Sequence, residues 1–478
     1  MISISRAAHS RKQIALYACN NRVFLLCFVR LYLCSRSIDV PKKEFKMNIF
    51  PYDAVVFDLD GTLCDAEDGI VSSVKVAMEQ LGCPIPEEAD LREVVGPPLR
   101  DSFRYMLKVP EDKVDEAMDI YREDFSARGM FLYSVYPHIR SILHLLHENG
   151  VHVALATSKP LWLAKDVLEY FGLDSDFTRI VGEKDGHAKM GKAELIRRAL
   201  PNHYKHAAMV GDRKFDMEGA HANNIDAIGA AYGCGSEEEL MDAGATVIVP
   251  DTESLRILLC PGVDVPRGYF LSVEGPDGSG KTTQVDLLEK NLRKFGFNVV
   301  RTREPGGCPI SEEIRRLVLS PDHMEMSDTC EALLYAASRA QHVHQVIRPA
   351  VERGDLVLCD RFVDSSVAYQ GGGRELGVDT IQQINEPAVG DMMPDATVYL
   401  AIDHREALMR RLNASEPDRL ELQDIEFHER VQKAYERLIK ENKKRFLVVD
   451  AARDIESIAK DAFDRVLERL LPERKKED

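Results

Sequence analysis

The stretch from Gly275 to Thr282 has residue types and spacing suited to holding phosphate groups. It reads Gly-Pro-Asp-Gly-Ser-Gly-Lys-Thr, a glycine-rich loop that ends in a lysine and a threonine. Backbone N–H groups of such a loop surround phosphate oxygens, Lys281 reaches the outer phosphates, and the Thr282 hydroxyl is a Mg²⁺ ligand. The pattern predicts a nucleoside triphosphate site that contains Gly275, Asp277, Gly278, Ser279, Gly280, Lys281, Thr282 and Thr283.

The residues on either side of this loop predict the elements that must position it. The apolar run 269–273 is typical of a buried strand, and residues 283–295 have apolar side chains at helical spacing. Strand, loop and helix therefore follow one another in the order that phosphate binding requires.

Two carboxylates near the start of the chain form a second candidate site. Asp58 and Asp60 follow the apolar run 54–57, which predicts another buried strand. At a strand end, one carboxylate can act as nucleophile while the other protonates the leaving oxygen and then deprotonates the attacking water. We expect Asp58 to take the first role and Asp60 the second.

Polar side chains at other predicted strand and helix ends extend this site. Thr157 and Ser158 offer hydroxyls that suit a phosphoryl oxygen. Asp212 and Asp216 offer the carboxylates that Mg²⁺ prefers when it joins an enzyme to a phosphate. Lys192 opens a predicted helix and would offset negative charge. Parallel sheets gather their ligands at the carboxyl ends of the strands, so we expect these groups to meet.

Short Val/Ile/Leu-rich strands alternate with amphipathic helices along most of the chain, which predicts the α/β class with two parallel-sheet domains. The Pro/Gly-rich stretch between the two blocks is typical of a linker. The predicted organisation is a basic leader (1–46), a first domain (47–259) with a mostly helical insert (about 66–134), a linker (260–267) and a second domain (268–478).

Composition limits the classes of partner. The net charge of −17 argues against general affinity for nucleic acid or anionic membranes, so small anionic substrates must be held by local cations and helix N-termini. The ten cysteines contain no C-x-x-C pair, which favours a reducing compartment such as the cytoplasm. The leader has nine Lys or Arg against two acidic residues. It is either an organellar transit peptide or an upstream extension before Met47.

The motifs of the first block, in this order, resemble the haloacid dehalogenase superfamily, most closely its phosphoglycolate-phosphatase-like branch. The resemblance implies a Rossmann-like core with a mobile helical cap and a Mg²⁺-dependent phosphatase that works through an aspartyl-phosphate. It makes Asp58 the nucleophile and a metal ligand, and Asp60 the acid/base, which also gives Mg²⁺ a backbone carbonyl. Asp212 and Asp216 complete the metal site, Thr157 and Ser158 bind phosphate, and Lys192 stabilises charge, with Lys189 as the neighbouring alternative.

The substrate of this first block stays open at the level of sequence. Phosphoglycolate or a related small phosphoester follows from the resemblance. The physical link to a nucleotide-binding block favours the alternative of a nucleoside 5′-monophosphatase. A third reading makes the block a regulatory module without catalysis.

The second block has three further charged motifs. The motif Arg-Glu-Pro-Gly-Gly (303–307) lies at the end of one predicted strand, and the motif Asp-Arg-Phe (360–362) lies at the end of another. Tyr335 and Arg339 lie at i, i+4 and so on one face of a predicted helix, where the ring can stack on a flat base while the arginine donates a hydrogen bond to it. The motif Tyr-Gln-Gly (369–371) brings the amide side chain of Gln370 as a further polar group.

These motifs resemble bacterial-type thymidylate (dTMP) kinase over residues 268–472. The resemblance implies the P-loop nucleoside monophosphate kinase fold and transfer of the ATP γ-phosphate to dTMP with Mg²⁺. Lys281 and Arg361 would be catalytic, and Asp360 would help to hold the metal. A homodimer is a further expectation. The dTMP site would comprise Glu304, Arg315, Tyr335, Arg339, Arg361, Ser365, Ser366 and Gln370.

The phosphate loop has no arginine between Gly275 and Lys281, so cationic help for the transition state must come from elsewhere. The resemblance implies a lid, for which residues 410–421 are the candidate. We expect Arg411 or Arg419 to act from it.

Overall fold

The computed structural model describes residues 50–87, 91, 93–96, 99–184, 190–263, 265–412, 419–420 and 423–471, with only the backbone of 411 and 412. These residues form two compact units, the first of which ends at Val263. The basic leader lies outside the described part. Within the described ranges, no helix combines the length and the apolar content needed to cross a membrane.

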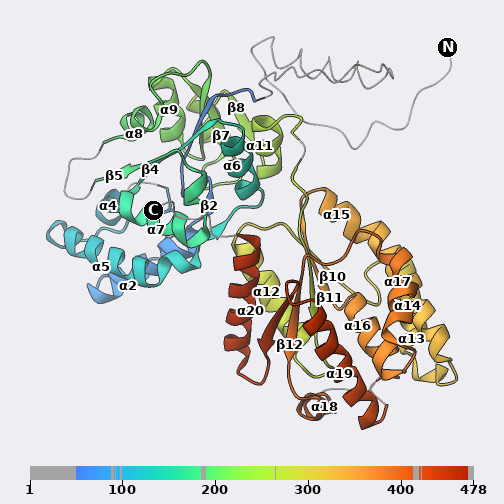
Figure 1. Cartoon of the computed structure of the whole chain (residues 1–478). Helices are drawn as coiled ribbons and strands as arrows, with labels where there is room; N and C mark the ends of the chain where they lie inside the picture. The colour runs from blue at the N-terminus through green and yellow to red at the C-terminus, as the bar shows by residue number, and fades with distance from the viewer. Residues whose placement is uncertain are drawn as a thin grey trace, which may run out of the picture. The chain divides into compact units, whose positions relative to one another are not determined.

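The first unit is built on a six-stranded sheet in the order β5-β4-β1-β6-β7-β8, with every neighbouring pair parallel (Figure 1). All four residues of β1 are buried, as expected for a strand covered on both faces. Its central place puts the following residue, Asp58, at the middle of the carboxyl edge. The strands are β1 (Ala54–Phe57), β4 (His152–Pro160), β5 (Arg179–Glu183), β6 (Ala207–Gly211), β7 (Asp226–Ala230) and β8 (Val247–Val249).

Helices flank this sheet and cover its apolar side chains. The cluster of Val56, Met209 and Leu195 shows how β1, β6 and α8 share one core. The helices are α6 (Ile139–Glu148), α7 (Leu161–Phe171), α8 (Lys192–Ala199), α9 (Lys214–Ala222), α10 (Glu237–Asp242) and α11 (Thr252–Leu259).

A mostly helical insert separates the first strand from the rest of the sheet. It leaves and returns through the short antiparallel pair β2 (Cys64–Asp65) and β3 (Ser134–Val135). Within it, α2 packs against α5. The rings of Tyr121 and Phe125 stack, and Phe125 meets the Tyr133 ring edge to face. The insert contains α2 (Glu67–Gln80), α4 (Leu99–Asp101), η1 (Ser102–Met106), η2 (Glu111–Lys113), α5 (Val114–Ala127) and η3 (Gly129–Leu132).

The second unit has a five-stranded parallel sheet in the order β10-β11-β9-β12-β13. Its central strand β9 leads into the glycine-rich loop, and α12 begins at Lys281 directly after it. The strands are β9 (Phe270–Glu274), β10 (Val299–Arg303), β11 (Leu356–Asp360), β12 (Ala396–Ala401) and β13 (Phe446–Asp450). The helices are α12 (Lys281–Lys294), α13 (Pro309–Leu319), η5 (Pro321–His323), α14 (Asp328–His342), η6 (Val343–Ile347), α15 (Arg348–Glu352), α16 (Val363–Ser366), η7 (Val367–Gly373), α17 (Val378–Val389), α18 (His404–Leu412), α19 (Ile425–Glu441) and α20 (Ile455–Leu470).

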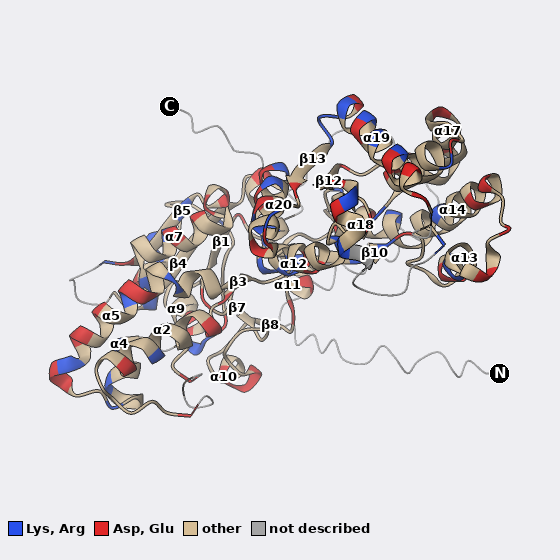
Figure 2. Cartoon of the chain, turned by 90° about the horizontal axis from the view of Figure 1, so that it is seen from below, with Lys and Arg blue, Asp and Glu red and all other residues tan. Residues whose placement is uncertain are grey.

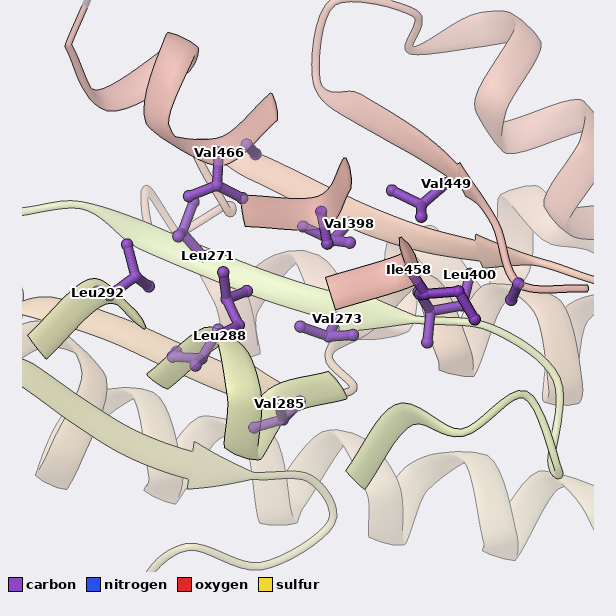
Figure 3. Packing of buried hydrophobic residues seen from close by; sticks show 14 of the residues in the cluster. Leu271, Val273, Val285, Leu288, Leu292, Val398, Leu400, Val449, Ile458 and Val466 are labelled. Atoms are coloured by element: carbon purple, nitrogen blue, oxygen red, sulfur yellow. The ribbon is translucent and has the colours of Figure 1, made fainter. Parts of the chain in front are cut away.

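One face of this second sheet is packed against α12 and α20 (Figure 3). Leu271 and Val273 of β9 point into the same cluster as Leu288 of α12 and Val466 of α20, and each is at most 2% exposed. Burying such a side chain contributes about 1.5–3 kcal/mol. This core holds β9 and α12 rigidly on either side of the loop. The predicted fold class, two parallel-sheet α/β domains, is confirmed.

Acidic and basic residues are interspersed on the outer helices of both units (Figure 2). Several lie four residues apart on one helix, as in Arg293–Glu289 (2.9 Å) and Arg437–Glu441 (2.7 Å). Pairs of this kind add about 0.2–0.5 kcal/mol each to a helix. They support the helices without forming a site.

Candidate active sites

Three carboxylates and one ammonium converge at the carboxyl edge of the first sheet. Asp58, Asp212 and Asp216 each bring one oxygen within 4.8 Å of the others. Lys192 Nζ lies 2.8 Å from Asp58 Oδ1 and 2.7 Å from Asp216 Oδ1. The strand ends of β1 and β6 and the first turns of α8 and α9 supply these groups. Carboxylate oxygens grouped in this way fit a hard cation such as Mg²⁺.

The electrostatics of this cluster suit a cation as well. Burial, followed by the charges of Asp216 and Asp58, raises the pKa of Asp212 to about 7. Burial also raises the pKa of Asp216 to about 6, although Lys192 opposes the shift. Burial works against charge on Lys192, but Asp216 and Asp58 raise its pKa overall. The carboxylates thus repel one another, and a divalent cation would relieve that repulsion.

Gly61 lets the backbone pass close to this cluster. Its φ is +79°, and a Cβ atom built there would lie 2.1 Å from Asp212 Oδ2. Only glycine fits that approach without strain. Asp212 is further held by Thr62 Oγ1 at 3.2 Å and by the backbone N–H of Cys234 at 2.9 Å.

Asp60 has a cationic partner that the sequence did not predict. Lys159 Nζ lies 3.1 Å from Asp60 Oδ2 and donates to the Tyr133 hydroxyl at 3.1 Å. It also lies 4.4 Å from the centre of the Phe125 ring. Lys159 is 8% exposed, so its charge acts in a place of low dielectric. Residues of the insert therefore help to fix the proposed acid/base.

A cavity of about 660 Å³ connects these groups with the helical insert. Thr157 is buried at the end of β4 and Ser158 is exposed, and both line the cavity. Arginines of the insert reach its other side. The lining includes Asp58, Asp60, Asp216, Lys192, Thr157, Ser158 and Lys159 from the core, and Leu99, Arg100, Arg104, Met118, Tyr121 and Arg122 from the insert. The structure thus brings the predicted residues together, while Lys189 lies outside the described residues.

We expect the variant Asp212→Asn to stabilise the metal-free protein at pH 8. The folded state keeps the Asp212 proton up to about pH 7, whereas an unfolded chain releases it near pH 3.8. The contribution of this group to the free energy of unfolding is therefore present at low pH and is lost as the pH rises from about 4 to 7. The variant removes that loss, a gain on the order of a few kcal/mol.

Urea unfolding with and without Mg²⁺ measures this effect. Trp162 is the single tryptophan of the chain and lies on α7, so its fluorescence reports the first unit. The advantage of Asp212→Asn should shrink toward pH 4, and Mg²⁺ at pH 8 should stabilise the wild type more than the variant. A difference that does not change with pH would contradict the raised pKa.

In the second unit, Lys281 turns back onto its own loop. Its Nζ donates to the carbonyls of Gly275 (3.1 Å) and Pro276 (2.8 Å). Burial, followed by the nearby charge of Arg361, lowers the pKa of Lys281 to about 8. Exchanging these carbonyls for phosphate oxygens would favour the charged form of the lysine.

Arg361 joins the end of β11 to this loop. It has φ +67°, and its guanidinium donates to the Gly275 carbonyl (3.1 Å), to Ser365 Oγ (3.0 Å) and to Asp277 Oδ1. Although burial works against it, Arg361 lowers the pKa of Asp277, which also accepts from the Tyr369 hydroxyl at 2.7 Å.

A cavity of about 540 Å³ lies next to these groups and brings most of the predicted nucleotide residues together. Among the predicted residues, it is lined by Asp277, Gly278, Gly280, Lys281, Thr282, Thr283, Glu304, Arg315, Tyr335, Arg339, Asp360, Arg361, Ser365, Ser366 and Gln370. Gly275 and Ser279 belong to the loop but do not line this space.

Arg339 is more constrained than the sequence suggested. It is 1% exposed and donates to Glu304 Oε2 (2.7 Å), Asn385 Oδ1, the Phe362 carbonyl (3.2 Å) and Ser366 Oγ (3.1 Å). A guanidinium has five N–H groups, so these four bonds leave one N–H on Nη1. Arg339 can therefore offer a ligand a single fixed donor.

The resemblance places Glu304 in the dTMP site, where its carboxylate already has two protein partners. It pairs with Arg339, and its other oxygen lies 2.9 Å from His342 Nδ1. Because a carboxylate accepts, Nδ1 carries the hydrogen, and Nε2 faces Thr302 Oγ1 at 2.6 Å. The principal contact of Glu304 is thus with Arg339.

The lid expectation needs a correction at Arg419. This residue is 2% exposed, donates to the Val318 carbonyl at 3.0 Å and pairs with Glu331, so it is an internal anchor and not a lid arginine. The Arg411 side chain lies outside the described residues. Arg410, at the end of α18, lines the cavity instead and donates to the Ala451 carbonyl at 3.0 Å.

Sequence reasoning missed three residues that hold the sites in place. Lys159 directly follows Ser158, which was predicted to bind phosphate, and this position was the signal that could have identified the lysine. Glu274 ends β9 with 0% exposure, and burial followed by Asp364 raises its pKa to about 7. It accepts from the Tyr435 hydroxyl at 2.9 Å. Glu331 lies four residues before Tyr335, but nothing in its spacing revealed its partners.

Comparisons with known proteins match each unit separately. Residues 273–462 match the model of the family described as thymidylate kinase, and residues 55–230 match that of the haloacid dehalogenase-like hydrolases. Thymidylate kinase from Exiguobacterium sp. is 48% identical over 203 residues, which are 42% of this chain and 96% of the relative. Thymidylate kinase from Bacillus licheniformis is 46% identical over 209 residues, 43% of this chain and 98% of the relative.

Solved structures resemble the chain over a similar share of its length. A predicted phosphatase from Clostridium acetobutylicum is 41% identical, with TM-score 0.40, over 43% of this chain and 96% of that one. A haloacid dehalogenase-like hydrolase from Streptococcus pneumoniae is 30% identical, with TM-score 0.39, over the same shares.

The family models and the relatives thus agree with the motifs at the carboxyl edges of the two sheets. The chain belongs to the thymidylate kinase family through its second unit and is a fusion of that kinase with a haloacid dehalogenase-like phosphatase.

Proposed function

We propose that the second unit transfers the γ-phosphate of ATP to dTMP and produces dTDP and ADP with Mg²⁺. The observation that supports this most is the shared cavity, which joins Lys281 and Thr282 of the loop to Tyr335 and Gln370. Loop N–H groups and Lys281 would hold the triphosphate, and Thr282 with Asp360 would hold the metal. Mg²⁺ would offset the charge that develops during transfer.

In this proposal the residues of the chain mainly position the reactants. Arg361 would hold the dTMP phosphate in line with the ATP phosphate, with Ser365 beside it. Tyr335 would stack on the base, while Arg339 and Gln370 would meet its polar edge. Such positioning accounts for most of the catalysis in phosphoryl transfer between nucleotides.

The test of the kinase is ADP formation with dTMP against dUMP, dCMP, AMP and GMP. We expect dTMP to give the highest kcat/KM. Rapid turnover of AMP or GMP without turnover of dTMP would exclude the proposed substrate. The chelator EDTA should abolish turnover, and added Mg²⁺ should restore it.

We further propose that the first unit hydrolyses a phosphomonoester through an aspartyl-phosphate on Asp58. An Asp58 oxygen would attack phosphorus while the ester P–O bond breaks, and Asp60 would give its proton to the leaving oxygen. Asp60 would then take a proton from the water that releases inorganic phosphate. Asp58, Asp212 and Asp216 would hold Mg²⁺, which neutralises phosphate charge.

Phosphoglycolate or a related small phosphoester is the first candidate substrate, as in the branch that the motifs resemble. The cavity of about 660 Å³, which is lined by Arg100 and Arg104 as well as by Asp58 and Asp60, favours a larger anionic substrate as the second. A nucleoside 5′-monophosphate has that size. Phosphate release from a panel containing both classes distinguishes them, and failure to hydrolyse any phosphomonoester with Mg²⁺ present would contradict the phosphatase proposal.

A further inference from the structure

One buried carboxylate in the kinase unit connects the base-reading amide with two arginines. Glu331 lies near the start of α14 and is 0% exposed. Its Oε1 accepts from Gln370 Nε2 at 2.8 Å, and its Oε2 accepts from Arg374 at 3.1 Å and from Arg419. Glu331 does not line the cavity, whereas Gln370 does.

This contact determines which way round the Gln370 amide is held. An ionised carboxylate can only accept hydrogen bonds, so the NH₂ group must point to Glu331 and the carbonyl oxygen must point away. Among the described residues, none donates to that carbonyl oxygen. Gln370 is 1% exposed and lines the cavity, so the carbonyl is the group that it can offer to a ligand.

The two arginines keep the carboxylate in place. Arg419 also donates to the Val318 carbonyl at 3.0 Å, and Arg374 donates to Gln423 Oε1 at 2.9 Å. Gln423 in turn donates to the Arg419 carbonyl at 3.1 Å. Buried charges paired on two sides are costly to disturb, so Glu331 cannot turn easily away from Gln370.

We propose that Glu331 is a specificity-determining positioning residue, which holds the Gln370 amide with its carbonyl toward the base. The proposal rests on the dTMP kinase function proposed above. The site then presents one acceptor, from Gln370, and one donor, the remaining N–H of Arg339. Thymine and uracil offer the complement, a donor at N3 and an acceptor at O4. Cytosine has the reverse pattern, an acceptor at N3 and a donor at N4, so it leaves both protein groups unpaired.

The test compares dUMP with dCMP, because both lack the thymine methyl group and differ only at the polar edge of the base. Glu331→Gln replaces an acceptor by an amide that can donate or accept, so Gln370 becomes able to turn over. We expect the ratio of kcat/KM for dUMP to that for dCMP to fall at least about tenfold. Glu331→Asp retains a carboxylate and should keep most of the preference. An unchanged ratio in an active Glu331→Gln protein would overturn the proposal.

A matched control separates orientation from loosening of the fold. Asp364 is 2% exposed and pairs with Arg445, so Asp364→Asn breaks another largely buried pair of the same unit. It should lower stability and leave the ratio unchanged. An equal fall of the ratio in Asp364→Asn would mean that the ratio reports general damage, and the inference would be wrong.

A second variant applies if Glu331→Gln does not fold. Replacing a buried ion pair by apolar residues of similar size is often tolerated, so Glu331→Met with Arg419→Met removes the carboxylate together with its most buried partner. Arg374 keeps its ion pair with Asp328 at 3.3 Å. The preference should fall by a similar factor, and its retention would overturn the inference. If the wild type does not phosphorylate dTMP, the proposed function itself fails, a result that is distinct from an unchanged ratio in an active variant.

Discussion

Replacement of Lys281 by alanine is expected to abolish the kinase activity and leave the phosphatase activity intact. The ammonium lies within the glycine-rich loop, where it is 8% exposed and donates to two loop carbonyls. When a triphosphate occupies the loop, this ammonium can stay in contact with the γ-phosphate during transfer and stabilise its charge. Loss of one such preorganised charge costs about 10²–10³-fold in kcat.

The measurement is ADP formation with dTMP at saturating ATP, together with phosphate release by the same preparation. Lys290→Ala is the matched control, since Lys290 is an exposed lysine on the same helix α12. It should leave both activities unchanged. A Lys281→Ala protein that retains more than about a tenth of the wild-type kinase rate would contradict the proposed role of the loop.

The core of both sites could be predicted because parallel sheets place their strand ends along one edge. Asp58 and Asp212 are 154 residues apart in sequence, yet β1 and β6 are neighbours, with Val55 opposite Ala208. Short buried strands and the motifs after them were enough to predict that arrangement. The same logic placed Lys281 and Arg361 next to each other, since β9 pairs with β11.

The side chains that orient these groups could not be predicted in this way. Lys159 meets Asp60 only because the insert brings Tyr133 and Phe125 to it. Arg419 belongs to a charged stretch that is typical of a solvated lid, and its burial depends on Glu331, 88 residues earlier. Such partners follow from tertiary packing, which local spacing does not encode.

Asp58→Asn is expected to reduce phosphatase activity by at least about 10³-fold, because an amide cannot act as the nucleophile. It should leave the protein folded, since it removes one of three carboxylates that repel one another around Lys192. Phosphate release from a panel of phosphomonoesters measures the loss. Asp242→Asn, at an exposed position of α10, is the control and should behave as the wild type does.

The same variant tells whether the first unit is an enzyme or a regulatory module for the kinase. If Asp58 acts only in hydrolysis, the rate of ADP formation with dTMP should stay within about twofold of the wild type. If the unit instead controls the kinase through its Asp58 site, the kinase rate should change strongly in a protein that is still folded. Residual phosphatase activity near the wild-type level would exclude Asp58 as the nucleophile, whatever the kinase does. Lys281→Ala is expected to lose the kinase activity and keep the phosphatase activity. The two variants together therefore test whether each activity depends on the site in its own unit.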